Sequence, residues 1–471
     1  MAIPAEPPSL DPQRDPIDAR ARDIAYYVYE SLAQPNPQTG EPTPRLAKSW
    51  DVSADGRTYT FHLRPSVVWH DGAPFTADDV VYTFDYLRDP KTPASGVRSY
   101  VTPLSEVIAV DALTVRFTLK EPYWFALRAI TDIYIYPKHL AERFDRRAPI
   151  GLGKFRFKAW KVGAAITLTR FEDYFGAKPA FTTLAFEVVS DATRRMTMAR
   201  RGEIDVIERL TPDQWNESAD LENSFERLHH VPDGIQVIGW NTARPVFADV
   251  RLRRALTMLI DRYDIVTNLR YGLDSVADSW FYPDAPEHDA TLKQAPYDIE
   301  GAKRLLEELG RKNGMTFTFL YPASNPFYDQ LAATLVHEMG LLHIEVRTER
   351  LEWAAYTERL RKHDFDACGL VWRVEPNSDP SSLWHSRSIA DGSNWLSFSS
   401  AKADALLDAA HSEMDHAKRT ALYRQFASIL SEELPATLLF NRYNLSLVSK
   451  RFRHGASTPY GLFRYDDFVP L

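Results

Sequence analysis

The stretch that decides the fold covers residues 45–86 and reads RLAKSWDVSADGRTYTFHLRPSVVWHDGAPFTADDVVYTFDY. Within it, Tyr59, Phe61 and Leu63 alternate with polar residues. This period of two is typical of a strand with one buried face and one solvated face. Asp55-Gly56 supplies the turn that leads into this strand.

A helix is predicted to follow the strand in the same stretch. Thr76 stands three residues ahead of Asp79, so its hydroxyl can cap the first backbone N–H groups while the carboxylate reaches back. Val80, Val81, Phe84 and Leu87 then form one apolar stripe.

Several coupled positions in this stretch resemble the signature block of a known family. They are Pro44, Leu46-Ala47, Ser49-Trp50, Asp55-Gly56, Phe61, Leu63-Arg64, His70-Asp71-Gly72, Pro74-Phe75 and Ala77-Asp78-Asp79-Val80. In this order and spacing they resemble the bacterial extracellular solute-binding proteins of the peptide/nickel-binding family, which are the receptors of ABC importers.

Length and composition agree with this resemblance and exclude other classes of protein. A chain of 471 residues should form two or three domains, and 44% hydrophobic residues suffice to build them. A net charge of −8 with scattered Lys and Arg argues against a nucleic-acid partner or an anionic membrane. Cys368 is the only cysteine, so we expect a buried core residue and no intrachain disulfide.

The beginning of the sequence bears on the expected location. No apolar run approaches the ~18 residues of a membrane helix. The first residues, MAIPAEPPSLDP, contain no export signal. The family begins with a leader, so we expect a periplasmic or extracellular protein, possibly lipid-anchored, whose leader is not included here. A cytoplasmic protein is the alternative.

Three stretches mark further organisation. Residues 34–44 are rich in Pro and Gly and predict a connection between domains. Residues 108–110 and 113–119 flank Asp111-Ala112 and predict a hairpin. Residues 151–155, GLGKF, argue against a phosphate loop because Arg156 replaces the third glycine. They resemble the family's GTGPY stretch, where the chain returns to its first domain.

The resemblance implies an α/β, two-lobed fold of the periplasmic-binding-protein (Venus-flytrap) type with an extra inserted domain. Lobe I would comprise residues 1–41, 148–233 and 442–471. The inserted domain, which carries the signature block, would cover residues 42–147, and lobe II would cover residues 234–441. Alternating helix and strand patterns between residues 299 and 372 also favour α/β packing.

Neither a metal site nor a catalytic centre is indicated. His343 stands six positions after His337 instead of the four of a zincin, and Gly340 should end that helix first. His229 and His230 adjoin in a stretch that we expect to be irregular, so they cannot chelate from one helix face. There is no GxSxG elbow. We therefore expect no metal, no cofactor and no enzyme, although an unrecognised carboxylate pair of a hydrolase stays open.

The candidate ligand site lies at residues 365–395, FDACGLVWRVEPNSDPSSLWHSRSIADGSNW. It resembles the family segment in which a strand crosses the ligand cleft. In peptide-binding members an acidic residue three positions after the tryptophan pairs with the peptide's amino terminus. Glu375 follows Trp372 at that spacing, where the family usually has Asp. Arg373 could neutralise Glu375 or hold a ligand carboxylate.

Other residues complete the expected site and its alternatives. Trp240 and Asn241 end the second crossing strand, and Trp395 ends the candidate segment. Stacking on tryptophans would dominate if the ligand were an oligosaccharide. Trp372 as a core aromatic and Glu375 as a surface residue are the structural alternatives.

We therefore expect a monomeric receptor that captures peptides or similar small solutes by hinge closure and delivers them to an ABC permease. Oligosaccharides and nickel chelates are alternative ligands within the same family.

Overall fold

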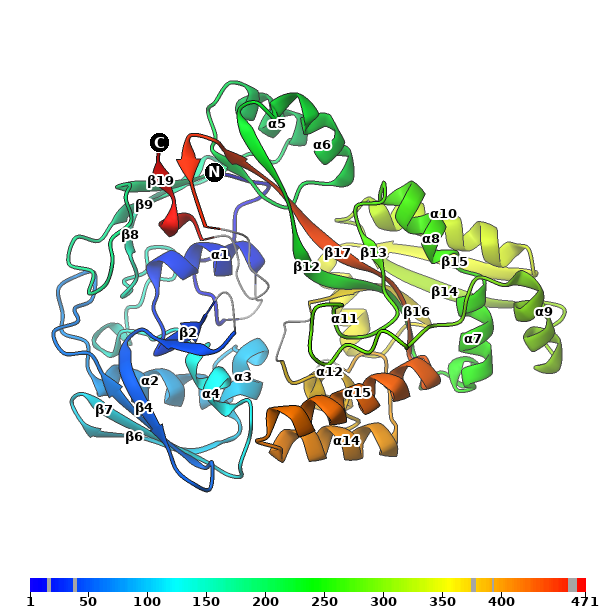
Figure 1. The fold of residues 1–471 in the computed structure, drawn as a ribbon, viewed down its shortest axis with the longest axis horizontal. Helices are drawn as coiled ribbons and strands as arrows, with labels where there is room; N and C mark the ends of the chain where they lie inside the picture. The colour runs from blue at the N-terminus through cyan, green and yellow to red at the C-terminus, as the bar shows by residue number, and fades with distance from the viewer. Residues whose placement is uncertain (15–17, 37–39, 374–377, 392–393, 456–463) are drawn as a thin grey trace. The chain divides into compact units, whose positions relative to one another are not determined.

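The computed structural model of the chain describes residues 1–14, 18–36, 40–373, 378–391, 394–455 and 464–471. The chain divides into two compact units, shown in Figure 1. Unit 1 comprises residues 1–231 and 444–471, and unit 2 comprises residues 232–443. The predicted second lobe, 234–441, has nearly the same bounds as unit 2. The further division into an inserted domain at 42–147 stays a prediction.

Unit 1 contains one larger sheet and a separate four-stranded sheet. The order in the larger sheet is β17-β11-β1-β10-β9-β8, in which β1 runs parallel to both neighbours. Its strands are β1 (Ala2–Ile3), β8 (Phe155–Lys161), β9 (Ala165–Arg170), β10 (Thr183–Val188), β11 (Val206–Ile207) and β17 (Ala436–Ser449). The four-stranded sheet has the order β4-β5-β7-β6, built from β4 (Ala47–Val52), β5 (Thr58–Leu63), β6 (Leu104–Asp111) and β7 (Thr114–Leu119). The helices of unit 1 are α1 (Ala19–Val28), α2 (Ala77–Arg88), α3 (Ser95–Val101), α4 (Ala126–Thr131), α5 (Ala192–Arg200) and α6 (Pro212–Glu217).

Unit 2 is built on strands in the order β15-β14-β16-β12-β17. These are β12 (Phe225–Trp240), β14 (Met315–Pro322), β15 (Ile344–Leu351) and β16 (Ala367–Trp372), with the short β13 (Ser275–Val276) on β17. The helices are α7 (Val250–Met258), α8 (Arg262–Asp264), α9 (Ile299–Glu308), α10 (Phe327–Gly340), α11 (Trp353–Arg361), α12 (Ser381–Trp384), α13 (Ser388–Asp391), α14 (Ala401–Ser412) and α15 (His416–Glu433). Strands β12 and β17 each begin in one unit and end in the other.

The elements predicted in the signature block are confirmed. Strand β5 buries Tyr59, Phe61 and Leu63 on one face and alternates with less buried residues. Helix α2 begins after a Thr76 capping box, in which the Asp79 carboxylate accepts from the Thr76 N–H at 2.9 Å. The predicted hairpin is formed by β6 and β7.

Two local predictions are wrong. The Pro-rich stretch is not only a connection, because β2 (Ala33–Pro35) pairs antiparallel with β3 (Pro42–Pro44). A two-stranded ladder tolerates proline where no N–H is needed. His229 and His230 do not lie in an irregular stretch, since both belong to β12, which begins at Phe225.

The predictions about buried Cys368 and the end of α10 are confirmed. Cys368 is a buried free thiol, and α10 ends at Gly340, before His343. Among the described residues no helix is long and apolar enough to cross a membrane.

The signature histidine explains the two glycines of GLGKF. His70 is buried, its Nδ1 accepts from the Gly151 N–H at 3.2 Å, and its Nε2 donates to the Gly153 carbonyl at 3.0 Å. A Cβ on Gly151 would come within 1.9 Å of the Val28 carbonyl oxygen at the end of α1. The signature block, the loop of residues 151–155 and the end of α1 are thus in direct contact within unit 1.

We predict that His70 makes the stability of unit 1 depend on pH. Burial, the largest cause, lowers the pKa of His70 to about 4 from 6.5. Between these values the unfolded chain binds a proton that the folded chain does not, so stability is lost as pH falls from about 6.5 to about 4. The loss from this group is about 3 kcal/mol.

The test is urea unfolding, followed by circular dichroism, of the parent and His70→Gln across this pH range. Gln keeps one donor and one acceptor but does not titrate. The parent should lose about 3 kcal/mol more than the variant on acidification. His62→Gln, at a more exposed histidine beside Asp51, is the control and should follow the parent. An equal loss in His70→Gln and the parent would refute the assignment.

Candidate functional site

The candidate site is organised by β16, which lies between β14 and β12 in unit 2. Its pairing with β12 sets Trp372 opposite Ile235 and Ala367 opposite Trp240. Gly369 is required in the middle of the strand, because a Cβ there would come within 2.4 Å of the Tyr328 ring. The register therefore fixes where Trp372 leaves the sheet.

Trp372 is 6% exposed and packs against two other tryptophans. Its ring centroid lies 5.3 Å from that of Trp280 and 5.1 Å from that of Trp384. Arg373 follows it and is exposed, without an ion pair or hydrogen bond to the described part of the chain. Glu375, the predicted anchor, lies outside the described residues. Trp372 and Arg373 are thus adjacent, one in an aromatic cluster and one in solvent.

Trp240 is a core residue of unit 2 in this structure. It is 0% exposed, and its indole N–H donates to Thr437 Oγ1 at 3.1 Å. Its ring packs against Phe247 and Phe317. The ring therefore presents no open face for stacking, and direct ligand contact by Trp240 stays a prediction.

Asn241 is also buried, and its side-chain amide forms hydrogen bonds within the protein. Its amide donates to the carbonyls of His363 at 3.0 Å and Phe365 at 2.9 Å. His363 has a φ of 52°, in the left-handed region that a non-glycine side chain seldom adopts. Asn241 thereby holds the turn that leads into β16, and contact with a ligand stays a prediction for it too.

Trp395 is half-buried and is held by its backbone. Its carbonyl lies 2.9 Å from His363 Nδ1, while His363 Nε2 lies 3.2 Å from the Ile389 carbonyl. His363 thus ties the end of the candidate segment to the start of β16. The structure brings Trp240, Asn241 and Trp395 close to this turn, whereas Trp372 and Arg373 lie at the other end of β16.

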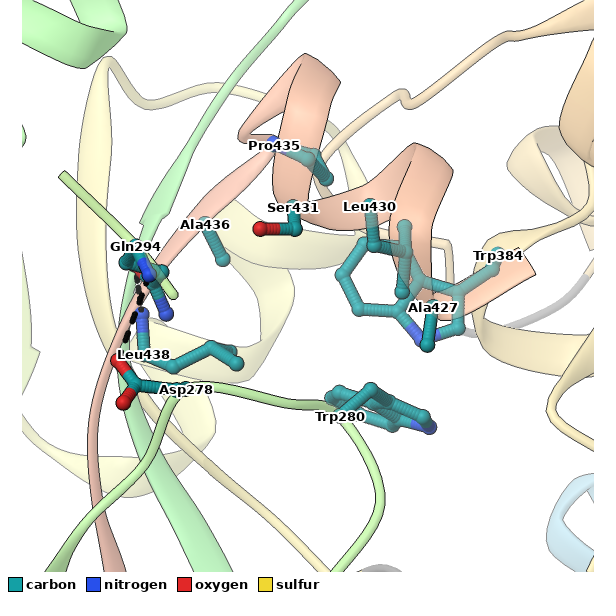
Figure 2. A pocket seen from close by; sticks show the side chains of 10 residues that line it. All are labelled: Asp278, Trp280, Gln294, Trp384, Ala427, Leu430, Ser431, Pro435, Ala436 and Leu438. Carbon is teal, nitrogen blue, oxygen red and sulfur yellow. Dashed lines mark hydrogen bonds between the residues drawn. The ribbon is translucent and has the colours of Figure 1, made fainter. Parts of the chain in front are cut away.

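A pocket within unit 2 adjoins the tryptophan cluster (Figure 2). Figure 2 shows Trp280 and Trp384 on one side of it and Asp278 and Gln294 on the other. The lining residues are Asp278, Trp280, Gln294, Trp384, Ala427, Leu430, Ser431, Pro435, Ala436 and Leu438. The cavity of about 20 Å³ has room for a single water molecule or one small group.

The charged wall of this pocket is compensated internally. Asp278 accepts from Arg262 at 3.0 Å and from Lys293 at 3.0 Å. Burial alone would raise the pKa of Asp278, but the two cations outweigh burial and hold this pKa below its usual value. The Asp278 carboxylate is therefore ionised at neutral pH, and the two cations compensate its negative charge.

Sequence reasoning did not single out Trp280 and Trp384. Trp280 lies outside any recognisable motif, whereas Trp384 lies within the candidate segment without being singled out, and the fold brings both to Trp372. The described residues contain no group of three or more His, Cys, Asp or Glu side chains placed to hold a metal ion.

The fold and the crossing strands define the class of protein. Unit 1 and unit 2, joined by β12 and β17, have the α/β, two-lobed fold of periplasmic binding proteins. The family model for bacterial extracellular solute-binding proteins, family 5 (Middle) matches residues 41–394. The chain belongs to this family.

The chain is also similar to individual binding proteins along most of its length. The chain is similar to the oligopeptide-binding protein AppA of Bacillus subtilis (strain 168), with 28% identity over 90% of this chain and 82% of that protein. It is 29% identical to heme-binding protein A of Haemophilus influenzae, over 94% of this chain and 86% of the relative. The solved structure of Bacillus subtilis AppA in complex with a nonapeptide matches with a TM-score of 0.87 and 26% identity, covering 100% of this chain and 98% of the other.

We predict that Asn241 is needed for the stability of unit 2. Asn241→Ala leaves the His363 carbonyl without its Asn241 donor, whereas the Phe365 carbonyl keeps the Arg244 Nε–H, so the free energy of unfolding should fall by about 1–3 kcal/mol. Urea unfolding followed by circular dichroism measures it.

The matched control for this change is Asn268→Ala. Asn268 is exposed and donates only to Asp264, so its loss should cost no more than about 0.5 kcal/mol. Equal losses in the two variants would show that the Asn241 amide does not hold the turn.

Proposed function

We propose that the chain is the substrate-binding component of an ABC importer and captures peptides or similar small solutes by hinge closure. The observation that carries this proposal is the family match over residues 41–394. The peptide class is supported by the relative named for oligopeptides and by the fold shared with a nonapeptide complex.

The chain path supports a hinge. The chain passes between the units at residues 231/232 and again at 443/444, within β12 and β17. Two strands crossing together permit a bending motion of one unit against the other with few backbone changes. Closure around a bound solute is the step that a membrane permease would recognise.

Recognition of a peptide would begin at the end of β16. Glu375 would accept from the peptide's terminal ammonium, a charge-assisted hydrogen bond that is stronger than a neutral one. Trp372 would supply an apolar wall, and exposed Arg373 would be available to a ligand carboxylate.

Other ligands keep a place in the proposal. The relative named for haem binding favours testing haem, and nickel chelates and oligosaccharides stay as the alternatives that the sequence resemblance implies. We propose binding without turnover, with a hydrolase as the alternative of a different class. The family further supports an exported, periplasmic or extracellular protein, with or without a lipid anchor, that acts as a monomer with its permease.

We predict that one ligand class stabilises the protein. A ligand that binds only the folded state raises stability by mass action, by about 2.7 kcal/mol at a hundred times its Kd. The midpoint temperature of thermal unfolding should therefore rise with peptides of two to nine residues. It should not rise with haem, nickel–histidine or cello-oligosaccharides. The protein must first be stripped of retained ligand by mild denaturation and refolding. Sustained hydrolysis of a peptide by the pure protein would refute a binding protein.

We predict that Glu375→Gln weakens peptide binding by about 2–5 kcal/mol, because the ligand ammonium loses its countercharge while the shape is kept. Titration calorimetry with a peptide found in the screen measures the loss. The control is Glu307→Gln, at an exposed carboxylate of α9, which should bind as the parent does. N-acetylation of the peptide should produce a comparable loss, and an unchanged affinity of the acetylated peptide would rule out Glu375 as the anchor.

A further inference from the structure

Three tryptophans from separate segments form one cluster in unit 2. Trp280 follows β13, Trp372 ends β16 and Trp384 ends α12. Every pair is in contact, with ring centroids 5.3 Å apart for Trp280 and Trp372, 4.9 Å for Trp280 and Trp384, and 5.1 Å for Trp372 and Trp384. The rings meet edge to face or tilted, which is the favourable geometry for aromatic pairs.

Two of these tryptophans carry an unsatisfied donor. Trp372 and Trp384 are 6% and 1% exposed, and their Nε1 atoms have no hydrogen-bond partner in the described part of the chain. A buried N–H without an acceptor is costly, and most buried donors in native proteins have a partner. Two such donors on neighbouring rings indicate a place that receives an acceptor from outside the chain.

The pocket lies against two of the three rings. Trp280 and Trp384 line it, and Figure 2 shows the Trp384 ring beside Leu430 and Ala427, above Trp280. Its small size admits one atom group of a larger molecule, with the remainder of that molecule outside.

The charges around the pocket favour an electron-rich group. Arg262 and Lys293 both form ion pairs with the carboxylate of Asp278, so its negative charge is already compensated. A cationic group would meet a carboxylate that is already engaged, whereas an oxygen acceptor finds the unused indole donors.

We propose that the indole N–H groups of Trp372 and Trp384 donate to an acceptor oxygen, a carbonyl or a carboxylate, of the captured solute. The identity of the solute rests on the proposed function. The hydrogen-bond chemistry of the two indole groups does not depend on it. The cluster then selects solutes by the position of an oxygen atom, in addition to any contact with their ammonium group.

The experiment uses Trp372→Phe and Trp384→Phe, each of which keeps an aromatic ring and removes the N–H. Trp69→Phe, at a fully buried tryptophan of unit 1, is the control for the volume lost. Trialanine and its carboxy-terminal amide are titrated by calorimetry into the full chain. Each cluster variant should bind trialanine about tenfold more weakly, as expected for one lost hydrogen bond, and Trp69→Phe should bind as the parent does. A loss in the cluster variants for the acid alone identifies a carboxylate, and a loss for both peptides identifies a carbonyl.

A second measurement separates this inference from the proposed function. The chain has 11 tryptophans, and the Phe variants assign the indole N–H signals of 15N-labelled protein. If no peptide binds, the proposed peptide function fails, and acetate and N-methylacetamide serve as the smallest acceptor probes. Downfield shifts of the Trp372 and Trp384 signals on addition of either probe would uphold the inference. Unmoved signals with these probes, or unchanged trialanine affinity in both cluster variants, would overturn it and assign the donors to water.

Discussion

The candidate site depends on the pairing of β16 with β12. Each strand carries a glycine where another segment packs on the sheet, because a Cβ on Gly239 would come within 2.5 Å of Leu396, and one on Gly369 within 2.4 Å of Tyr328. Both positions therefore need glycine, and a one-residue slip would place a side chain in each of these contacts. The register that results fixes Trp372 at one end of β16 and the Asn241 turn at the other.

The two ends of β16 differ in how their polar groups are satisfied. At the Asn241 end the side-chain amide donates within the protein, to the carbonyls of His363 and Phe365. At the Trp372 end the indole N–H groups have no acceptor among the described residues, and Arg373 is exposed. Saturated networks rigidify a protein, whereas unused donors are where a ligand gains most. The second end is therefore the better place for recognition.

Local rules explain what could be predicted from the sequence. Strand β5 and helix α2 follow from alternation and from a capping box, which depend only on near neighbours. The Pro-rich hairpin of β2 and β3 was missed because proline content indicates where a chain turns, but not whether the flanking residues pair. His229 and His230 were expected in an irregular stretch because they do not fit an apolar strand pattern, yet both belong to β12.

The tryptophan cluster shows where prediction from sequence ends and why. Trp372 was found because of its spacing to Glu375 in the family-like segment, but tertiary packing alone shows that Trp280 and Trp384 are its partners. Trp240, by contrast, is buried in the core of unit 2 and donates its indole N–H to Thr437, while its contact with a ligand stays a prediction. Both rings end neighbouring strands of one sheet, and aromatic character alone does not distinguish them. The difference lies in the unsatisfied donor, a property that depends on three-dimensional surroundings and not on residue type.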